Sequence, residues 1–387
     1  MWEITLPKII VAGEGASEYL ERIEGRKALI VTGKTVRKVG FTDKIARHLK
    51  KAEIEVEFFE VEPEPSVETV VRGANVAKSF SPDLIIGLGG GSNMDAAKAI
   101  WVLYERPDIE VASINPFIKL GLRRKARLIC IPTTSGSGSE ASWATVITSP
   151  ADERKLELAN KELVPDIAII DPEFPMIMPQ KLVAETGFDA LTHAIEAYVS
   201  PLGNDFSDAL AMKAIKTIFN YLKRSYMDTQ DKEAREKMHI AATMAGMAFT
   251  NSEVGIAHAL GHVTGGVLHV PHGRAMAIIL PYSIEYNAGV AKQKYVEIAK
   301  AVGIKARTDD EAVKKLVRKV VQLRRELELP SSFKEAGISK EEFEKKLDDL
   351  ANKATKSVVL RGNPRPLSLE EAKKLFTYMY KGKSVDF

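Results

Sequence analysis

The sequence predicts an α/β domain with a parallel sheet over residues 1–182, followed by an all-α domain over residues 183–387. Three observations support this prediction. The 387 residues exceed the size at which one hydrophobic core usually stops growing, so two domains are expected. The first half alternates short apolar runs with helix-like stretches, which is typical of β-α-β units. From about Ala184 onward, the pattern contains long amphipathic segments and no convincing strand.

The first half contains the strands expected to form the sheet. Most of them are continuously apolar, as expected for parallel strands that helices cover on both faces, whereas residues 55–61 alternate between polar and apolar. The predicted strands are residues 27–32, 55–61, 83–88, 128–132 and 167–171. Helical patterns lie between them at residues 42–51, 67–79 and 95–104.

The second half is predicted to be helical throughout. Its clearest helical patterns are residues 208–221, 231–248, 291–301, 310–327, 340–354 and 369–380. The proline-rich stretch 171–179 separates the halves and is predicted to be the joint between the domains. Ligands of such sheets bind beyond the carboxyl ends of the strands, which we expect to face the cleft between the domains.

Bulk composition excludes several classes of function. The net charge of +3 is small, and no block of Lys and Arg reaches the density typical of nucleic-acid binding. The single cysteine, Cys130, lies in an apolar run, which excludes a disulfide scaffold and favours core packing. No apolar run is long enough to span a bilayer, and the start of the chain does not resemble a signal peptide. We therefore expect a cytoplasmic protein that binds neither nucleic acid nor membranes.

A glycine-rich turn follows the strand predicted at residues 83–88. Gly89, Gly90 and Gly91 allow the backbone to turn tightly and to approach an anion closely. The helix that follows would direct its free N–H groups toward that anion. Ser92 could equally be a plain N-cap. The turn is not the usual G-x-G-x-x-G fingerprint, so by itself it indicates phosphate binding only weakly.

A second polar turn, at residues 132–140, follows the strand predicted at residues 128–132. Five hydroxyl side chains and two glycines there offer many donors to a pyrophosphate or a ribose. A flexible linker is the alternative, but apolar segments flank the turn closely on both sides. Two donor-rich turns after two parallel strands predict a nucleotide site.

Several histidines and an aspartate have the spacing of metal ligands. Asp189 and His193 are four residues apart, which places a carboxylate and an imidazole on one face of a helix. His258 and His262 repeat this spacing, and His272 lies in a Pro-His-Gly segment expected to be a turn. Any one of these residues alone would be interpreted as a hydrogen-bonded polar residue of the core. Together they favour a metal site.

The spacing and type of these ligands disfavour a zinc protease but fit several metals. His258 and His262 have the spacing of a zinc-protease motif, but Ala259 occupies the place of its catalytic glutamate, so a protease is disfavoured. Imidazole and carboxylate ligands suit Fe(II), Zn, Ni and Co alike.

These motifs together resemble the iron-dependent (group III) alcohol dehydrogenase family, over nearly the whole chain. The resemblance is carried by four segments: the Gly-Gly-Gly-Ser-x-x-Asp-x-x-Lys run at 89–98, the Thr-Thr-x-Gly turn at 133–136, the Gly-x-Asp-Ala-Leu-Thr-His-Ala-x-Glu segment at 187–196 and the His-x-x-x-His…Pro-His-Gly segment at 258–273. The resemblance implies a dehydroquinate synthase-like fold, with a dinucleotide-binding α/β domain before a helical metal-binding domain.

The resemblance also implies a role for individual residues. Asp189, His193, His258 and His272 would bind one divalent metal, usually Fe²⁺, with Zn²⁺ as the alternative. His262 would be a further active-site histidine that serves in proton transfer, and His269 matches no functional position. The residues expected to contact the cofactor are Gly33, Lys34, Gly90, Gly91, Ser92, Asp95, Thr133, Thr134, Ser137, Val146 and Lys155.

Two positions depart from the common pattern of the family. Glu64 stands where members often have Asn, which puts a cofactor contact from that residue in doubt. Members that prefer NAD often carry Asp just after the first strand, where this chain has Gly33, followed by Lys34 and Arg37. Without that carboxylate a 2′-phosphate meets no repulsion and finds positive charge nearby, so NADP(H) is expected in preference to NAD(H).

The function expected from the resemblance is hydride transfer between a small primary alcohol or aldehyde and NAD(P), in a homodimer. A glycerol or polyol dehydrogenase, or another dehydroquinate synthase-like enzyme such as a lyase, is the nearest alternative. From a different class, the chain could bind nucleotide and metal without turnover.

Overall fold

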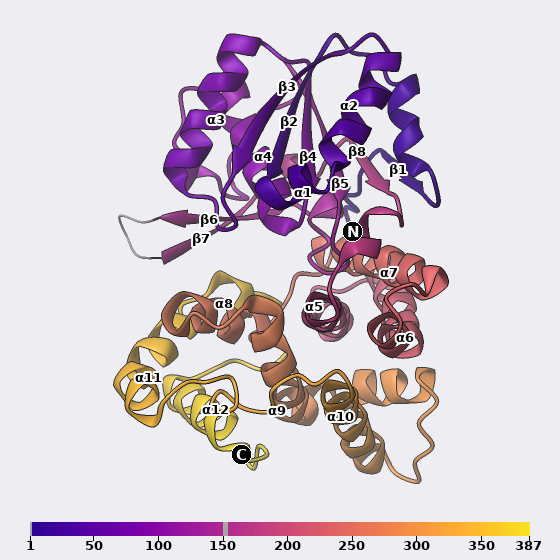
Figure 1. The fold of residues 1–387 in the computed structure, drawn as a ribbon. Helices are drawn as coiled ribbons and strands as arrows, with labels where there is room; N and C mark the ends of the chain where they lie inside the picture. Colours follow the sequence, from indigo (N-terminus) through magenta and orange to yellow (C-terminus); the bar gives the residue numbers. More distant parts are fainter. Residues whose placement is uncertain (1, 150–153) are drawn as a thin grey trace. The chain divides into compact units, whose positions relative to one another are not determined.

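The computed structural model describes residues 2–149 and 154–387 and divides into two compact units (Figure 1). An α/β unit comprises Thr5–Met178, and a helical unit comprises Pro179–Phe387 together with the few residues before Thr5. The division falls within the proline-rich stretch 171–179, whose only regular structure is the short 3₁₀ helix η5 (Phe174–Ile177).

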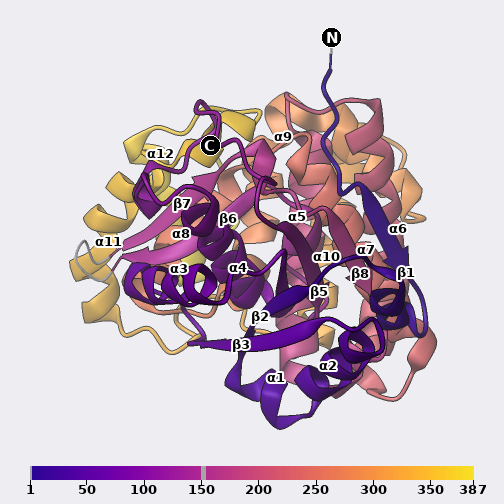
Figure 2. The same cartoon turned by 90° about the horizontal axis from the view of Figure 1, so that it is seen from above.

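The α/β unit contains a six-stranded sheet in the order β1-β8-β5-β4-β2-β3, and every neighbouring pair is parallel. The strands are β1 (Ile9–Ala12), β2 (Lys27–Gly33), β3 (Glu55–Val61), β4 (Leu84–Gly89), β5 (Arg127–Pro132) and β8 (Ile167–Ile170). This finding confirms the predicted parallel sheet. Figure 2 shows its strands side by side, with helices on both faces.

Helix packing on both faces explains why the strands are continuously apolar. Leu29, Ile85 and Leu128 belong to a core formed with α3 (Val67–Phe80) and α4 (Gly91–Glu105). The next residues along the same strands, such as Ile30 and Ile86, belong to a second core. That core also contains side chains of α2 (Phe41–Lys51) and of the 3₁₀ helix η1 (Ala16–Arg22). Successive side chains of a strand point to opposite faces of the sheet. Because helices cover both faces, the side chains on each face are buried.

Three strands were not predicted. β1 is only four residues long and mostly exposed, so it leaves no buried apolar run in the sequence. β6 (Ala144–Ser149) and β7 (Arg154–Ala159) pair antiparallel in a separate two-stranded sheet. Buried and partly buried positions alternate along β6, but its polar and apolar residues do not, so the sequence carries no alternating strand signal there.

The helical unit has no strand among its described residues. Its helices are α5 (Gln180–Val199), α6 (Asp205–Met227), α7 (Lys232–Thr250), α8 (Ile256–Leu268), α9 (His272–Ala301), α10 (Asp309–Glu326), α11 (Lys340–Ala354) and α12 (Leu369–Lys381). Several begin at a side-chain cap, of which Asn204 and Ser368 form complete capping boxes. The six predicted helices are all present, and their boundaries extend beyond the predicted ones at half of the ends.

Helix α9 differs most from its prediction. The sequence predicts a helix only over 291–301, whereas the observed helix begins at His272 and departs from helical geometry at Ala291 (φ −115°, ψ 21°). Its first half is buried on almost all sides, so it shows no amphipathic period. The expectation that His272 lies in a turn was therefore wrong: it is the first residue of α9, directly after Pro271.

Among the described residues, no helix is both long enough and apolar enough to cross a membrane.

Replacement of Phe376 by alanine should destabilise the protein. Phe376 is fully buried in the core between α8, α9, α11 and α12, so truncation leaves a cavity that costs about 3–5 kcal/mol. We expect the melting temperature, followed by circular dichroism, to fall by on the order of 10 °C. Phe117→Ala removes the same ring from a site that is 87% exposed and should leave the melting temperature nearly unchanged. Equal effects of the two substitutions would contradict this assignment of the core.

Candidate active site

Three helices bring the predicted metal ligands together. Asp189 and His193 lie one turn apart on α5, His258 lies in the first turn of α8, and His272 begins α9. Asp189 Oδ1 is 3.2 Å from His272 Nε2, 3.8 Å from His258 Nε2 and 3.9 Å from His193 Nδ1. A tetrahedral site with bonds of 2.0–2.1 Å separates its ligand atoms by about 3.3 Å, close to these distances.

The polar atoms that face one another in this cluster lack hydrogen-bond partners. Within the described part of the chain, Asp189 Oδ1, His193 Nδ1 and His258 Nε2 are buried and have no hydrogen-bond partner. Each unpaired buried polar atom costs about 1–3 kcal/mol, so a cluster of three requires compensation. One divalent metal ion would satisfy all of them, because carboxylate and imidazole are suitable ligands for such ions. Possible ligand atoms of Asp189, His258 and His272 all lie within 4.8 Å of one another, and this compact group does not include His193.

The electrostatics of the cluster favour the ligand forms of two of these residues. Burial is the largest influence on His193, and with the neighbouring imidazoles of His258 and His272 it lowers the pKa of His193 to about 3. Burial opposes ionisation of Asp189, but the surrounding imidazoles hold the pKa of its carboxyl well below the usual value. A neutral imidazole and an ionised carboxylate are the forms that bind a metal.

His258 is held between two carboxylates. Burial alone would lower the pKa of its imidazole, but Asp189 and Glu196 on either side raise it to about 9. Glu196 Oε2 lies 2.6 Å from His258 Nδ1, the ring nitrogen that does not face Asp189. No role for Glu196 is predicted from the sequence. Its only signal was its place in the Asp-x-x-x-His-x-x-Glu segment, three residues after His193.

His262 and Phe249 border the cluster. The ring of His262, on α8, is partly exposed, and its centroid lies 5.4 Å from that of His272 and 5.8 Å from that of His258. The ring of Phe249 stacks on His193 with a centroid separation of 4.6 Å, which covers one side of the cluster. His269 is exposed and ends α8 with a left-handed backbone (φ 54°).

In the α/β unit, the two donor-rich turns lie against each other. The backbone N–H of Thr133 donates to Gly89 O (2.9 Å), because β4 and β5 are neighbours in the sheet. A Cβ on Gly90 would lie 3.5 Å from Thr134 Oγ1, and one on Gly91 would lie 3.0 Å from the Cβ of Ser137. The glycines thus allow the turns to approach closely. Gly90, and not Ser92, is the N-cap of α4, and it provides no side-chain cap.

Asn93 connects this pair of turns to the end of β2. A Cβ on Gly89 would lie 2.6 Å from Asn93 Cγ, and a Cβ on Gly33 would lie 2.9 Å from Asn93 Nδ2. Asn93 Nδ2 is itself buried and unpaired. No sequence pattern distinguishes Asn93, since only the fold brings Gly33 and Gly89 together at its side chain.

Asp95 and Lys98 fasten the hydroxyl-rich turn to α4. The carboxylate of Asp95 accepts hydrogen bonds from Ser139 Oγ (2.7 Å) and from the backbone N–H of Val146 (2.9 Å). Lys98 is fully buried, and its ammonium donates to Ser139 Oγ, Ser142 O and Ala144 O, each at 2.9 Å. The carboxylate of Asp95 is therefore engaged within the protein.

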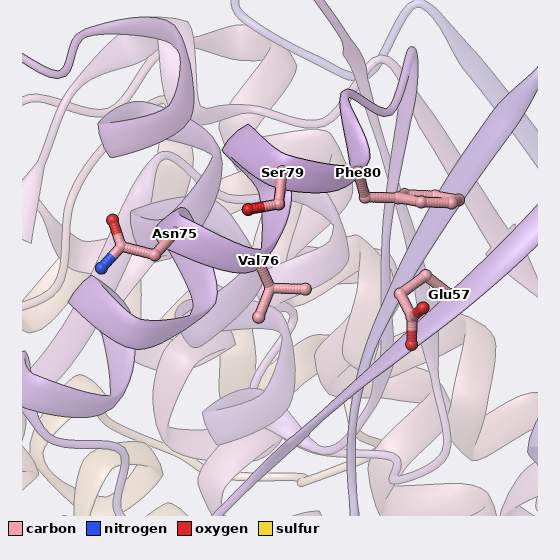
Figure 3. Close-up of a pocket in the computed structure, with 5 residues that line it drawn as sticks. All are labelled: Glu57, Asn75, Val76, Ser79 and Phe80. Atoms are coloured by element: carbon pink, nitrogen blue, oxygen red, sulfur yellow. The ribbon is translucent and has the colours of Figure 1, made fainter.

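The remaining predicted cofactor residues lie at the edge of this region. Gly33 is the N-cap of the short helix α1 (Lys34–Lys38), and both Lys34 and Arg37 are exposed on it. Lys155, on β7, pairs with Glu64 at 3.2 Å. A shallow hollow of about 450 Å³ between β3 and α3 involves none of these residues (Figure 3). It is lined by Glu57, Asn75, Val76, Ser79 and Phe80.

Comparison with known families covers both units of the chain. The model of the iron-containing alcohol dehydrogenases matches residues 7–172. The model of the C-terminal region of the Fe-containing alcohol dehydrogenase family matches residues 183–380.

Individual relatives agree with this result. An NADPH-dependent butanol dehydrogenase from Clostridium saccharobutylicum is 45% identical over 100% of both chains. The bifunctional aldehyde-alcohol dehydrogenase AdhE of Escherichia coli (strain K12) is 40% identical over 92% of this chain, which spans only 43% of that protein. The solved structure of an iron containing alcohol dehydrogenase from Thermococcus thioreducens superposes with a TM-score of 0.90 and 34% identity, over 98% of this chain and 100% of that one. The chain therefore belongs to the iron-containing alcohol dehydrogenase family and is an oxidoreductase that acts on alcohols.

Proposed function

We propose that the chain interconverts small primary alcohols and aldehydes with one bound Fe²⁺ and with NADP(H) in preference to NAD(H). The observation that carries the metal site is the set of buried, unpaired ligand atoms around Asp189 Oδ1. The proposed ligands are Asp189, His193, His258 and His272. The name of the butanol dehydrogenase relative supports a short primary alcohol as substrate.

The mechanism assigns binding and proton transfer to this chain's own residues. When bound, the metal supplies a Lewis acid for the alcohol oxygen, and the nicotinamide supplies the hydride acceptor. Asp189 and the three ligand imidazoles fix the position of the metal on three helices. Phe249 excludes water from the side of His193 on which it stacks. We propose that His262 takes up the hydroxyl proton and releases it to solvent, and its partial exposure and its ring contact with His272 support this role.

The two turns of the α/β unit are proposed to bind the cofactor's pyrophosphate. The N-cap Gly90 provides no side-chain cap to α4, so we propose that the N–H groups of Gly91 and Ser92 bind an anion at the positive end of the helix dipole. Further contacts are proposed from Ser92, Thr133, Thr134, Ser137, Val146 and Lys155. We propose that Asp95 positions the turns instead of contacting the cofactor, because its carboxylate already accepts hydrogen bonds from Ser139 and Val146.

Preference for NADP(H) is proposed from the end of β2. Gly33 leaves no carboxylate to repel a 2′-phosphate, and Lys34 and Arg37 supply exposed positive charge on α1. The butanol dehydrogenase relative, named as NADPH-dependent, supports the same choice. We further propose, on the family resemblance and composition alone, that the enzyme works as a cytoplasmic homodimer.

Substitution of a proposed metal ligand should abolish both metal binding and turnover. Replacement of His193 or His272 by alanine removes one imidazole from the site, so we expect metal content after purification to fall below one tenth of the wild-type value. Metal content is measured by atomic emission, and turnover is measured as aldehyde-dependent oxidation of NADPH. His269→Ala removes an exposed imidazole outside the cluster and should change neither quantity. Full activity of wild-type protein stripped of metal would contradict the proposal.

Removal of positive charge from α1 should weaken the use of NADPH selectively. A hydrogen bond to a charged group contributes about 1.5–3 kcal/mol, so Lys34→Ala or Arg37→Ala should lower kcat/KM for NADPH by about tenfold or more. The value for NADH should remain within about twofold. Lys38→Ala, which removes an exposed lysine from the last turn of the same helix, is the matched control. Equal losses of kcat/KM with NADPH and with NADH would show that these residues do not bind the 2′-phosphate.

A further inference from the structure

We infer that Glu196 is a positioning residue of the metal centre, which orients His258 toward the metal and anchors the first turn of α8. The inference rests on the metal site proposed above. It concerns a residue that would not touch the metal itself.

The first observation is the hydrogen bond between Glu196 and His258. Glu196 is only 3% exposed, and its Oε2 lies 2.6 Å from His258 Nδ1. A carboxylate oxygen accepts a hydrogen bond from Nδ1–H, so the proton that a bound metal would displace is the one on Nε2, whose lone pair then faces Asp189. His258 Nε2 is the buried, unpaired atom that faces Asp189 Oδ1 at 3.8 Å. Glu196 therefore selects the tautomer of His258 that can bind a metal.

The second observation is the way α8 begins. Its N-cap, Gly255, has no side chain to satisfy the first N–H groups. Glu196 Oε1 accepts from the N–H of Ala257 (2.5 Å), and Asn363 Oδ1 accepts from the N–H of Ile256 (3.1 Å). Side chains from α5 and from a segment near the end of the chain thus replace the missing cap.

Glycine at position 255 makes this arrangement possible. A Cβ there would lie 2.9 Å from Asn363 Oδ1 and 3.2 Å from Glu196 Oε1, so a larger residue would displace one of the two acceptors. One carboxylate of α5 therefore holds both the backbone of α8 and the imidazole that this turn carries. Since α5 also carries Asp189 and His193, Glu196 fixes the distance between the ligands of the two helices.

Charge balance supports the same role. In the described part of the chain, the buried carboxylates of Asp189 and Glu196 have ion-pair partners only among histidines. When the imidazoles take the neutral form that binds a metal, the two carboxylates leave a charge that one divalent cation would neutralise. A carboxylate behind a metal-binding imidazole is an arrangement that typically contributes 10–100-fold to metal affinity.

The test compares Co²⁺ binding by metal-free wild-type protein and by the Glu196→Gln variant. Glutamine has the size of glutamate, but its amide must turn an N–H toward either His258 Nδ1 or the N–H of Ala257. We expect affinity for Co²⁺ to fall about 10–100-fold. We also expect the visible absorption bands of bound Co²⁺ to shift, because the orientation of His258 changes. An affinity and a spectrum equal to those of wild type would overturn the inference.

Asn363→Ala is the matched control. Asn363 holds the same turn of α8 as Glu196, but its side chain does not contact His258. This variant should lose thermal stability and keep the wild-type Co²⁺ spectrum, with affinity within about threefold of wild type. An equal loss of affinity in both variants would overturn the inference, because anchoring of the helix would then explain the whole effect.

Two further outcomes are separated by design. If Glu196→Gln does not fold, Glu196→Asp replaces it, because the shorter carboxylate cannot reach both the N–H of Ala257 and His258 Nδ1. Wild-type affinity for Co²⁺ in the Glu196→Asp variant would overturn the inference. Failure of the wild-type protein to bind about one Co²⁺ per chain would overturn the proposed metal site, and the inference with it. Stoichiometric binding by wild type together with an unaltered variant would overturn the inference alone.

Discussion

The helical unit depends on one electrostatic constraint, the burial of the Asp189 carboxylate without a lysine or arginine beside it in the described part of the chain. A charge in that position is tolerated only if its surroundings compensate for it. The compensation comes from imidazoles on three helices, which must be positioned so that all of their rings reach one oxygen. The first turn of α8, the first residue of α9 and the middle of α5 are thereby placed relative to one another.

The α/β unit also buries a charged side chain, in this case the positively charged Lys98. Lys98 is a buried ammonium whose donors are satisfied by one hydroxyl and two backbone carbonyls of the segment that follows β5. Together with Asp95 it ties that segment and the start of β6 to α4. Loops rich in serine and glycine are usually mobile, because they lose much conformational entropy on ordering. The hydrogen bonds of the two charged side chains beneath this loop limit that freedom and keep the hydroxyl of Ser139 in place.

Sequence alone predicts the parts of this protein that repeat a local pattern. Such patterns are found in the apolar runs of β2, β4 and β5 and in the amphipathic surface helices α10 to α12. The four-residue spacing of Asp189 and His193 is another. The four-residue strand β1 and the fully buried first half of α9 have no distinguishing period. The roles of Glu196, Asn363 and Asn93 arise from contacts between segments far apart in the chain, which only the folded structure displays.

The origin of the ligands in α5, α8 and α9 has a consequence for folding and handling. A metal bound to all three helices would act as a cross-link that closes two long loops of the chain at once, much as a pair of disulfides would. Its stabilising effect would follow mass action, so the unfolding temperature of the helical unit would depend on the free metal concentration. Protein prepared in the presence of chelators would then have a low unfolding temperature. The cause would be removal of the metal during preparation, and not a weakness of the fold itself.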